Sequence, residues 1–373
     1  MSWTTDYGAV DKLLHRLAFA TWPIQAAMAD MEEVIFKARL EPVKLERPVF
    51  VSGLPRAGTT LTLQLIEGAG EFASYRYRDM PFLLTPMLWN AMTGQADRSV
   101  EARERAHGDG VAIDLDSPEA FEEVVWRTLY PKKYGAHAIQ PWRGVIDEDK
   151  AHFFRAQMRK IVALRSQGRG PMRYLSKSNG NIARFATIAG MFPDAVIIVP
   201  YRRPLDHAGS LLRQHRNFLA MHQSDRFARE YMGAIGHYDF GMNLKPIDFS
   251  GWLDAGPAPD FTALDGWLRY WCAAYGFLLE QTELPLNFLS YDALCENGAR
   301  ELEGLEATLG LARPGALVGQ APEIRPGAAR AEEAADPALL REAEAVHQRL
   351  EQRRLAQRPA AAPVRPARKR SKG

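Results

Sequence analysis

Residues 48–60 have the sequence Pro-Val-Phe-Val-Ser-Gly-Leu-Pro-Arg-Ala-Gly-Thr-Thr. The apolar run up to Ser52 and Gly53 predicts a short buried strand. Apolar residues at helical spacing after Thr59 predict a helix that ends at Gly68. The loop between them can surround an anion, because successive backbone N–H groups meet the positive end of the helix dipole there.

The same alternation of strand and helix continues along the chain. Apolar runs predict further strands at 72–76, 172–177, 195–201 and 286–291, and helices are predicted at 181–191, 204–219, 264–283 and 299–309. This order predicts an α/β fold in which helices cover both faces of a parallel sheet. Residues from about 80 to 170 are predicted to form a mostly helical insertion. The Gly-, Pro- and Asp-rich segment 239–261 is predicted to be a loop that can serve as a lid.

Four regions are expected around this sheet. Residues 1–47 form N-terminal helices, with a break near Pro23, and residues 48–311 form the central domain with its insertion. Residues 312–357 form a helical extension, and 358–373 a basic tail. An apolar stripe in the first helix is predicted to pack on the domain; its residues are Val10, Leu13, Leu14 and Leu17.

Charge and composition exclude several classes of protein. The chain of 373 residues has 47 Lys and Arg, 45 Asp and Glu, and a net charge of +2. Six positive residues lie in the tail, so the rest carries −4, and no nucleic acid partner is expected. The tail is rich in Ala, Pro and Arg and is predicted to be disordered; a solubilising role is favoured over contact with an anionic surface.

The cellular location is predicted from three kinds of sequence feature: a secretory signal, a membrane span and a disulfide scaffold. The first residues lack the basic and apolar parts of a secretory signal, and the early apolar stretch 17–29 is too short to span a bilayer. Two cysteines cannot form a disulfide scaffold. A reducing, cytoplasmic location is therefore expected, and a homo-oligomer is compatible with the sequence.

The loop carries residue types suited to a group with two or more charged oxygens. Arg56 supplies a permanent positive charge with forked donors, Gly58 allows close approach, and Thr59 and Thr60 supply hydroxyl groups. The alternative is a tight turn with an exposed Arg. The loop is not a Walker A motif, because Gly58 is followed by Thr59 and not by Lys, so an ordinary ATP or GTP hydrolase is disfavoured.

A second feature follows the predicted strand 195–201. Arg202 leaves the end of this strand, and Ser210 lies two helical turns later. Both belong at the carboxyl edge of the sheet, where they can converge on one phosphate. The alternatives are a salt bridge from Arg202 to Asp206 and a solvated Ser210.

Together, the loop and the pair Arg202 and Ser210 resemble the two signatures of sulfotransferases that use 3′-phosphoadenosine 5′-phosphosulfate (PAPS). Three further stretches, 175–179, 192–195 and 290–294, also resemble this family, so the likeness spans residues 48 to 311 in order. Tyrosylprotein, carbohydrate and bacterial sulfotransferases are the most similar members. The resemblance implies a sulfotransferase fold of the P-loop NTPase type.

The resemblance assigns the nucleotide-binding residues. The 5′-phosphosulfate would be held by the loop residues Pro55, Arg56, Ala57, Gly58, Thr59 and Thr60. Arg202 and Ser210 would hold the 3′-phosphate, and Tyr291 belongs to the same cofactor-binding set. Ala57 stands where the family commonly has Ser. The family's C-terminal Arg-Lys-Gly is missing, and Arg325-Pro326-Gly327 is a weak substitute.

Three catalytic residues are predicted in the same way. Arg56 corresponds to the family's cation on the leaving phosphate, and Lys177 to a Lys that contacts the transferred sulfate; a surface Lys is the alternative. Asp79 is the hypothesis for the base, because it is the only acid in residues 75–82. Pairing of Asp79 with Arg76 or Arg78 is an equal alternative.

Glu122 and Glu123 are the reserve candidates for the base. The predicted reaction moves a sulfuryl group from PAPS to a hydroxyl of a carbohydrate, lipid, peptide or small molecule. No metal is required, because loop N–H groups and cations can stabilise the charge. The alternatives are a P-loop-type metabolite kinase and a non-catalytic nucleotide-binding module.

Overall fold

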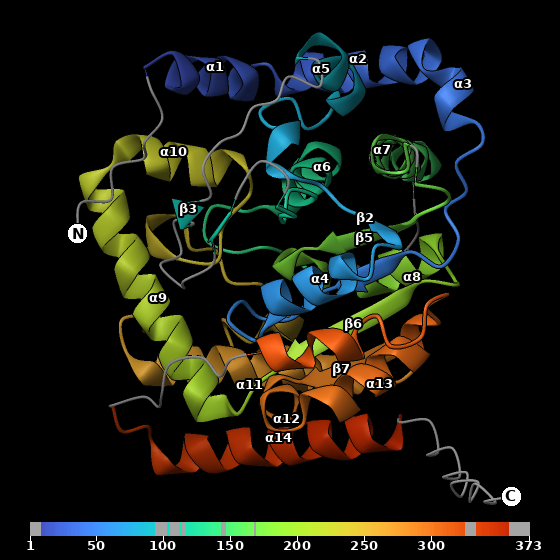
Figure 1. Cartoon of the computed structure of the whole chain (residues 1–373). Helices are drawn as coiled ribbons and strands as arrows, with labels where there is room; N and C mark the ends of the chain where they lie inside the picture. Colours follow the sequence, from blue (N-terminus) through green and yellow to red (C-terminus); the bar gives the residue numbers. More distant parts are fainter. Residues whose placement is uncertain are drawn as a thin grey trace, which may run out of the picture.

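A five-stranded parallel sheet forms the centre of the computed structural model (Figure 1). The structure describes residues 9–93, 103–104, 112–113, 117–142, 147–167, 169–324 and 333–357. In spatial order, the strands are β2 (Phe72–Ala73), β5 (Arg173–Lys177), β1 (Val49–Val51), β6 (Val196–Tyr201) and β7 (Leu286–Ser290). Every neighbouring pair is parallel. The predicted α/β fold with a parallel sheet is confirmed.

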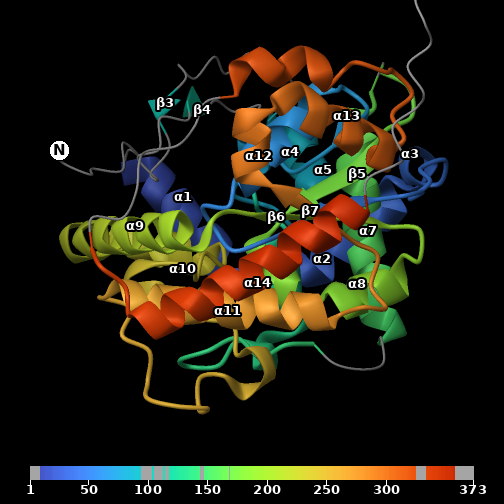
Figure 2. The ribbon, with the colours of Figure 1, turned by 90° about the horizontal axis from the view of Figure 1, so that it is seen from below.

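Helices close both ends of the sheet. The N-terminal helices α1 (Ala9–Ala20), α2 (Trp22–Ile35) and α3 (Lys37–Leu40) lie beyond β2, and α14 (Pro337–Ala356) lies at the opposite end beside β7 (Figure 1). Figure 2 shows α14 crossing α11 (Leu264–Glu280). The side chain of Tyr201 on β6 donates a hydrogen bond to Glu351 of α14 at 2.5 Å. The C-terminal extension is therefore tied to the sheet; the tail 358–373 lies outside the described residues.

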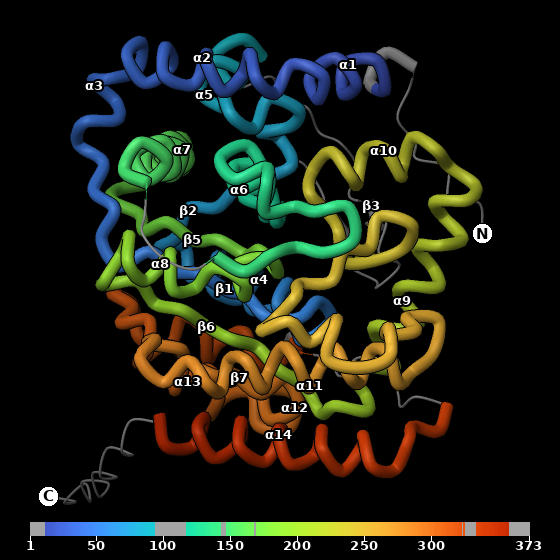
Figure 3. The backbone as a smooth tube through the Cα atoms, turned by 180° about the vertical axis from the view of Figure 1, so that it is seen from behind, coloured from blue at the N-terminus to red at the C-terminus, as the bar shows by residue number. Residues whose placement is uncertain are grey.

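The insertion between β2 and β5 is helical where its longest elements are described. It contains α5 (Pro86–Thr93), α6 (Glu123–Leu129) and α7 (Glu148–Arg165). It also contains a short antiparallel pair that was not predicted, β3 (Arg103–Glu104) with β4 (Ala112–Ile113). Helices α6 and α7 lie between the N-terminal helices and the sheet (Figure 3).

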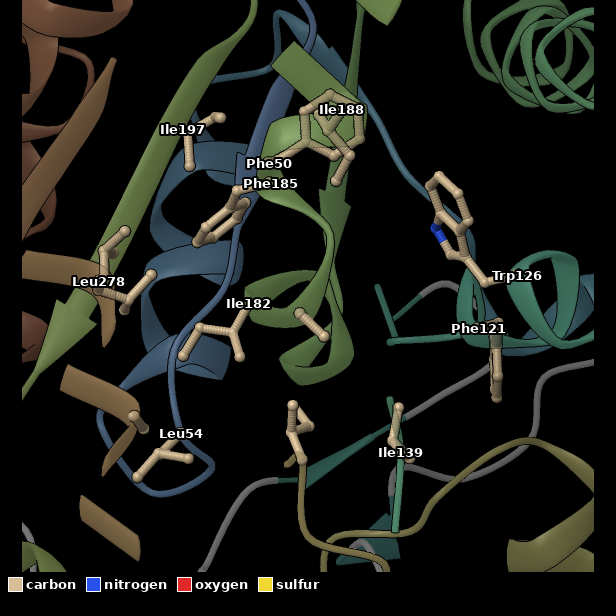
Figure 4. Close-up of a cluster of buried hydrophobic side chains, with 14 of the residues drawn as sticks. Phe50, Leu54, Phe121, Trp126, Ile139, Ile182, Phe185, Ile188, Ile197 and Leu278 are labelled. Atoms are coloured by element: carbon tan, nitrogen blue, oxygen red, sulfur yellow. The ribbon is translucent and has the colours of Figure 1, made fainter. Parts of the chain in front are cut away.

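Side chains of each strand alternate between two separate cores, as the two-residue period of a strand requires. Val49, Val51 and Ile198 pack against α4 (Thr59–Gly68) and α13 (Gly298–Leu309). Phe50 and Ile197 point to the other face, where α8 (Phe185–Met191), α11 and the insertion meet (Figure 4). Because both faces are covered, β1 and β6 are short apolar runs, whereas β5 also carries Arg173, Ser176 and Lys177.

Element boundaries differ from the predictions where side chains cap helices. β7 ends at Ser290, whose hydroxyl accepts a hydrogen bond from the Ala293 N–H and begins α12 (Tyr291–Glu296). Helix α9 (Pro204–Ser224) is longer than predicted. Asp225 then caps a further helix, α10 (Arg226–Ala234), for which there was no prediction.

The predicted packing of the first helix was wrong for two of its residues. Leu13 and Leu17 are 58% and 56% exposed, whereas His15 and Ala18 on the adjoining face are buried. Helix α2 is anchored by an internal ion pair between Glu32 and Lys160 of α7, 3.0 Å apart and fully buried. None of the helices in the described part of the chain combines the length and hydropathy that a membrane span requires.

Candidate active site

The predicted site residues follow the carboxyl ends of four neighbouring strands. Val51 at the end of β1 lies opposite Lys177 of β5, and Tyr201 at the end of β6 lies opposite Ser290 of β7. Because the strands are parallel, the segments that follow them emerge at one edge of the sheet. These segments carry the phosphate loop (residues 53–58), Lys177, Arg202 and Tyr291.

The phosphate loop has a backbone shape that is uncommon for non-glycine residues. Arg56 has φ of 71° and Gly58 has φ of 86°, both in the left-handed region. A non-glycine residue held there costs about 1–3 kcal/mol, and such residues cluster at ligand sites. The Ala57 N–H donates to the carbonyl of Leu54 at 3.3 Å, so this amide closes the turn, and Ala57 is fully buried.

Two glycines allow neighbouring strand ends to approach closely. A Cβ atom on Gly53 would lie 2.4 Å from the carbonyl oxygen of Pro200, which is part of β6. A Cβ atom on Gly58 would lie 2.6 Å from Cδ2 of Tyr291. Glycine at these positions therefore lets β6 and the Tyr291 ring contact the loop directly.

The two predicted anion-binding sets meet at this point. The Arg56 Nε donates to the Ser210 hydroxyl at 3.4 Å. The Arg202 guanidinium lies 5.2 Å from the centre of the Tyr291 ring, the same ring that covers Gly58. Arg202 and Ser210 are both buried. The structure thus brings together residues from the loop, from β6 with α9, and from α12.

His207 contacts the backbone of the phosphate loop. Its Nδ1 accepts a hydrogen bond from the Trp271 Nε1–H at 3.1 Å, and its Nε2 lies 2.8 Å from the Pro55 carbonyl oxygen. A nitrogen that faces a carbonyl must carry the proton, so the imidazole is neutral with hydrogen on Nε2. Burial lowers the pKa of His207 to about 3. This role could not be predicted from local sequence, because it depends on Trp271, 64 residues away.

This buried histidine should make the folded state sensitive to acid. In the unfolded chain His207 binds a proton near pH 6.5, whereas the native state resists protonation down to about pH 3. The contribution of His207 to the free energy of unfolding is therefore fully present above pH 6.5, and it is lost as the pH drops toward 3. Between pH 7 and pH 5 we expect His207 to account for a loss of about 2 kcal/mol.

Urea unfolding of the wild type and of His207→Gln at both pH values measures this contribution. The variant should lose about 2 kcal/mol less than the wild type over this interval. Equal losses in the two proteins would show that His207 is not held neutral. Burial also lowers the pKa of His215 and His222 to about 4, so the variant keeps part of the dependence.

Lys177 lies at the end of β5 next to a set of polar residues. Asn179, two residues later, lies with its Oδ1 3.4 Å from the Thr59 hydroxyl and donates from Nδ2 to the Asp239 carboxylate at 2.9 Å. Asp239 lies 3.9 Å from the Nε2 of His237. Thr59 is buried and Thr60 is half-buried in the first turn of α4.

His237 and Asp239 were not predicted as site residues. Burial lowers the pKa of His237, and the positive charge of Lys177 lowers it further, while Asp239 acts in the opposite direction. A His-x-Asp pair at the start of the Gly- and Pro-rich loop was the only sequence signal for them.

Asp79 has a different environment from the one predicted for a base. Its carboxylate forms a buried ion pair with Arg165 of α7 and accepts a hydrogen bond from the Arg76 N–H at 2.8 Å. The Arg76 side chain pairs instead with Glu67 at 2.5 Å. These contacts favour the structural alternative for Asp79, and they add Arg165 as a side-chain partner that the sequence did not suggest.

The reserve carboxylates are also surrounded by donors. Glu122 accepts hydrogen bonds from Trp126, Tyr174 and Asn181 at 2.8–3.0 Å. Glu123 accepts from Tyr134 and Ser178 at 2.5 and 2.6 Å and is paired with Arg184. Burial opposes ionisation of Glu123, but Arg184 and these donors hold its pKa below the usual value. The oxygens of both carboxylates are therefore already occupied by donors within the protein.

Two further features concern the C-terminal contact with the nucleotide and a metal ion. The segment Arg325-Pro326-Gly327 lies outside the described residues. Among the residues that are described, no group of three or more His, Cys, Asp or Glu side chains could hold a metal ion.

Comparison with solved structures finds sulfotransferases at low sequence identity. Among solved structures, the chain is similar to the sulfotransferase STF9 from Mycobacterium avium, with 12% identity, a TM-score of 0.45, and coverage of 86% of this chain and 80% of the other. It is also similar to a sulfotransferase from Alicyclobacillus acidocaldarius, with 15% identity, a TM-score of 0.35, and coverage of 84% and 97%. No curated protein matches the sequence.

A family model decides the assignment. The model described as "Sulfotransferase family" matches residues 48–244, which is more than half of the chain. The matched part includes the phosphate loop, Lys177, Arg202 and Ser210. This chain therefore belongs to the sulfotransferase family.

Proposed function

We propose that this protein transfers the sulfuryl group of PAPS to a hydroxyl group of an acceptor. The observation that carries the proposal is the contact between the two anion-binding sets, through Arg56 with Ser210 at 3.4 Å and through Tyr291 against Gly58 and Arg202. A nucleotide with charged groups at both its 5′ and its 3′ position needs two such sets close together. A nucleotide without a 3′-phosphate would use only one of them.

The charges at this edge suit such a nucleotide. Arg56, Arg202 and Lys177 bring three cations to the ends of three neighbouring strands. Arg202 is buried and lies over an aromatic ring. A guanidinium group fixed in this way is suited to bind an anion with several oxygens, such as a phosphate. Backbone N–H groups of the loop and of the first turn of α4 can contact the phosphosulfate.

The chemistry asks mainly for positioning and charge stabilisation. Arg56 would stabilise negative charge on the 5′-phosphate as it becomes the leaving group. Lys177 would contact the oxygens of the sulfuryl group during its transfer. Arg202 and Ser210 would hold the 3′-phosphate and keep the nucleotide in register with the loop.

The product nucleotide 3′,5′-ADP tests the proposal. It should raise the melting temperature more than 5′-AMP or 5′-ADP at equal concentration, because it alone engages both sets. Equal shifts would remove the role proposed for Arg202 and Ser210. Incubation with sulfur-35-labelled PAPS and a host extract, followed by identification of the labelled product, then defines the acceptor.

The same experiments separate the alternatives from the sequence analysis. A metabolite kinase would bind ATP in the presence of magnesium in preference to 3′,5′-ADP. A non-catalytic nucleotide-binding module would bind 3′,5′-ADP but release no labelled sulfate from PAPS in any condition.

Ser210→Ala should weaken binding of 3′,5′-ADP by about 1 kcal/mol, which is about fivefold in affinity. The change removes one neutral hydroxyl from the 3′-phosphate set and leaves both arginines. Ser224→Ala, at the exposed end of the same helix, is the control and should bind as the wild type does. Isothermal titration measures both; wild-type affinity in Ser210→Ala would exclude a contact with the nucleotide.

A further inference from the structure

A series of polar contacts leads from the phosphate loop to His237. Thr59, the first residue of α4, lies 3.4 Å from Asn179, and Asn179 donates to Oδ2 of Asp239 at 2.9 Å. The same carboxylate oxygen lies 3.9 Å from Nε2 of His237. The imidazole is therefore connected through only two side chains to the start of the helix that the loop precedes.

Asp239 lies on the side of the site where Lys177 ends β5, because Asn179, two residues after Lys177, donates to the Asp239 carboxylate at 2.9 Å. The positive charge of Lys177 is close enough to lower the pKa of His237. Lys177 and Asn179 come from the same strand end, next to the end of β1. His237 and Asp239 come from the segment after α10 and meet them from the other side.

The imidazole is held in place and remains accessible. It stacks on Phe218 of α9, with ring centres 5.1 Å apart and planes 8° from parallel. Side-chain exposure is 15% for His237 and 26% for Asp239. A group that is fixed by stacking but still reaches the surface of a site can contact a substrate.

The other candidates for a base are less suitable on the same grounds. Asp79 is paired with Arg165, and Glu123 with Arg184. Both oxygens of Glu122 accept hydrogen bonds from buried donors. These carboxylates are therefore already engaged by a cation or by donors within the protein, whereas a base must contact the acceptor.

We infer that His237 is the general base that removes the proton from the acceptor hydroxyl, and that Asp239 stabilises the imidazolium that results. The inference rests on the proposed function. The proton passes from the acceptor oxygen to Nε2 of His237 while that oxygen forms a bond to sulfur. The bond between sulfur and the bridging oxygen of the 5′-phosphate breaks, and its electron pair stays on the phosphate.

The fall in the rate of sulfuryl transfer at acidic pH should follow the protonation of His237. The charged and titratable groups that face it are Asp239, Lys177 at the end of β5, Glu119 before α6 and His222 of α9. Because the pKa of His237 is lowered, the imidazole is neutral and able to accept a proton at neutral pH. The rate should fall only when the pH drops below this lowered pKa.

The test measures binding and transfer separately in His237→Gln, Asp239→Asn and a control, His152→Gln. His152 is an exposed histidine of α7, paired with Glu33, and its variant should behave as the wild type does. All variants should bind 3′,5′-ADP with near wild-type affinity by isothermal titration. Single-turnover transfer from sulfur-35-labelled PAPS, to water and to the acceptor that the labelling experiment defines, should fall by about 10²-fold in His237→Gln.

Two further readouts distinguish a base from a structural histidine. Imidazole added in solution should restore part of the rate of His237→Ala, since it can take the place of the missing ring. In Asp239→Asn the fall in the rate at acidic pH should move to lower pH, because Asp239 raises the pKa of His237. In NMR spectra of histidine-labelled protein, the signal that is missing in His237→Gln identifies the His237 imidazole. Titration of that signal in the wild type then gives the pKa of His237.

The outcomes separate this inference from the proposed function. Absence of 3′,5′-ADP binding in the wild type would contradict the proposed function. Intact binding with wild-type transfer in His237→Gln, or a His237 NMR signal that titrates identically in Asp239→Asn, would overturn the inference and leave the proposed function in place.

Discussion

Replacing Lys177 by alanine should slow sulfuryl transfer by about 10²- to 10³-fold and leave the affinity for 3′,5′-ADP nearly unchanged. Lys177 lies at the end of β5 opposite Val51, the last residue of the strand that precedes the phosphate loop. Its ammonium group would contact oxygens that belong to the sulfuryl group and are absent from 3′,5′-ADP. The loss should therefore appear in the rate and not in nucleotide binding.

Single-turnover transfer with saturating PAPS measures the rate, and isothermal titration measures binding. Lys44→Ala is the matched control, because the Lys44 side chain is 82% exposed and makes only a surface ion pair with Glu46. Its rate should equal that of the wild type. A large loss of 3′,5′-ADP affinity in Lys177→Ala would show that Lys177 contacts the nucleotide and not the sulfuryl group.

Arg202→Ala should weaken binding of 3′,5′-ADP by about 2–5 kcal/mol, about 30-fold or more in affinity. Arg202 is buried, and its guanidinium lies over Tyr291, so a contact with the 3′-phosphate would be made by a fixed and largely desolvated cation. A charge-assisted contact of this kind is worth more than the neutral hydroxyl of Ser210.

The next residue in the chain is the control for this variant. Arg203 is about half exposed and pairs with Glu296 on the surface at 2.7 Å. Arg203→Ala should reduce affinity by less than about 1 kcal/mol, the range of surface ion pairs. Isothermal titration of both variants decides the assignment. Equal affinities of Arg202→Ala and Arg203→Ala, with both folded, would exclude the 3′-phosphate contact.

His207 and His237 have different surroundings, which suit them to different roles in the proposed site. His207 is fully buried, holds the Pro55 carbonyl and affects stability through its low pKa. His237 is partly exposed beside Asp239 and Lys177 and is suited to proton transfer. Substitution of His207 should therefore change the pH dependence of folding, whereas substitution of His237 should change the pH dependence of transfer.

Local sequence was sufficient for the sheet and for the phosphate loop. Strands buried on both faces are short apolar runs, and they stand out against the helices and loops that connect them. The residues that follow such strands must gather at one edge when the strands are parallel. For this reason Arg202 and Ser210 could be predicted to lie at that edge without any tertiary information, whereas Lys177 and Tyr291 were assigned through the resemblance to the family.

The choice of a base depended on tertiary contacts, because the same carboxylate can serve as a base or as half of an ion pair. Asp79 is the only acid in its segment, but Arg165, 86 residues away, pairs with it. Glu123 is likewise engaged by Arg184, 61 residues away. His237 and Asp239 became candidates only because folding places them beside Asn179 and Lys177. Proton affinity is set by burial and by neighbouring charges, and in this chain those neighbours come from distant segments.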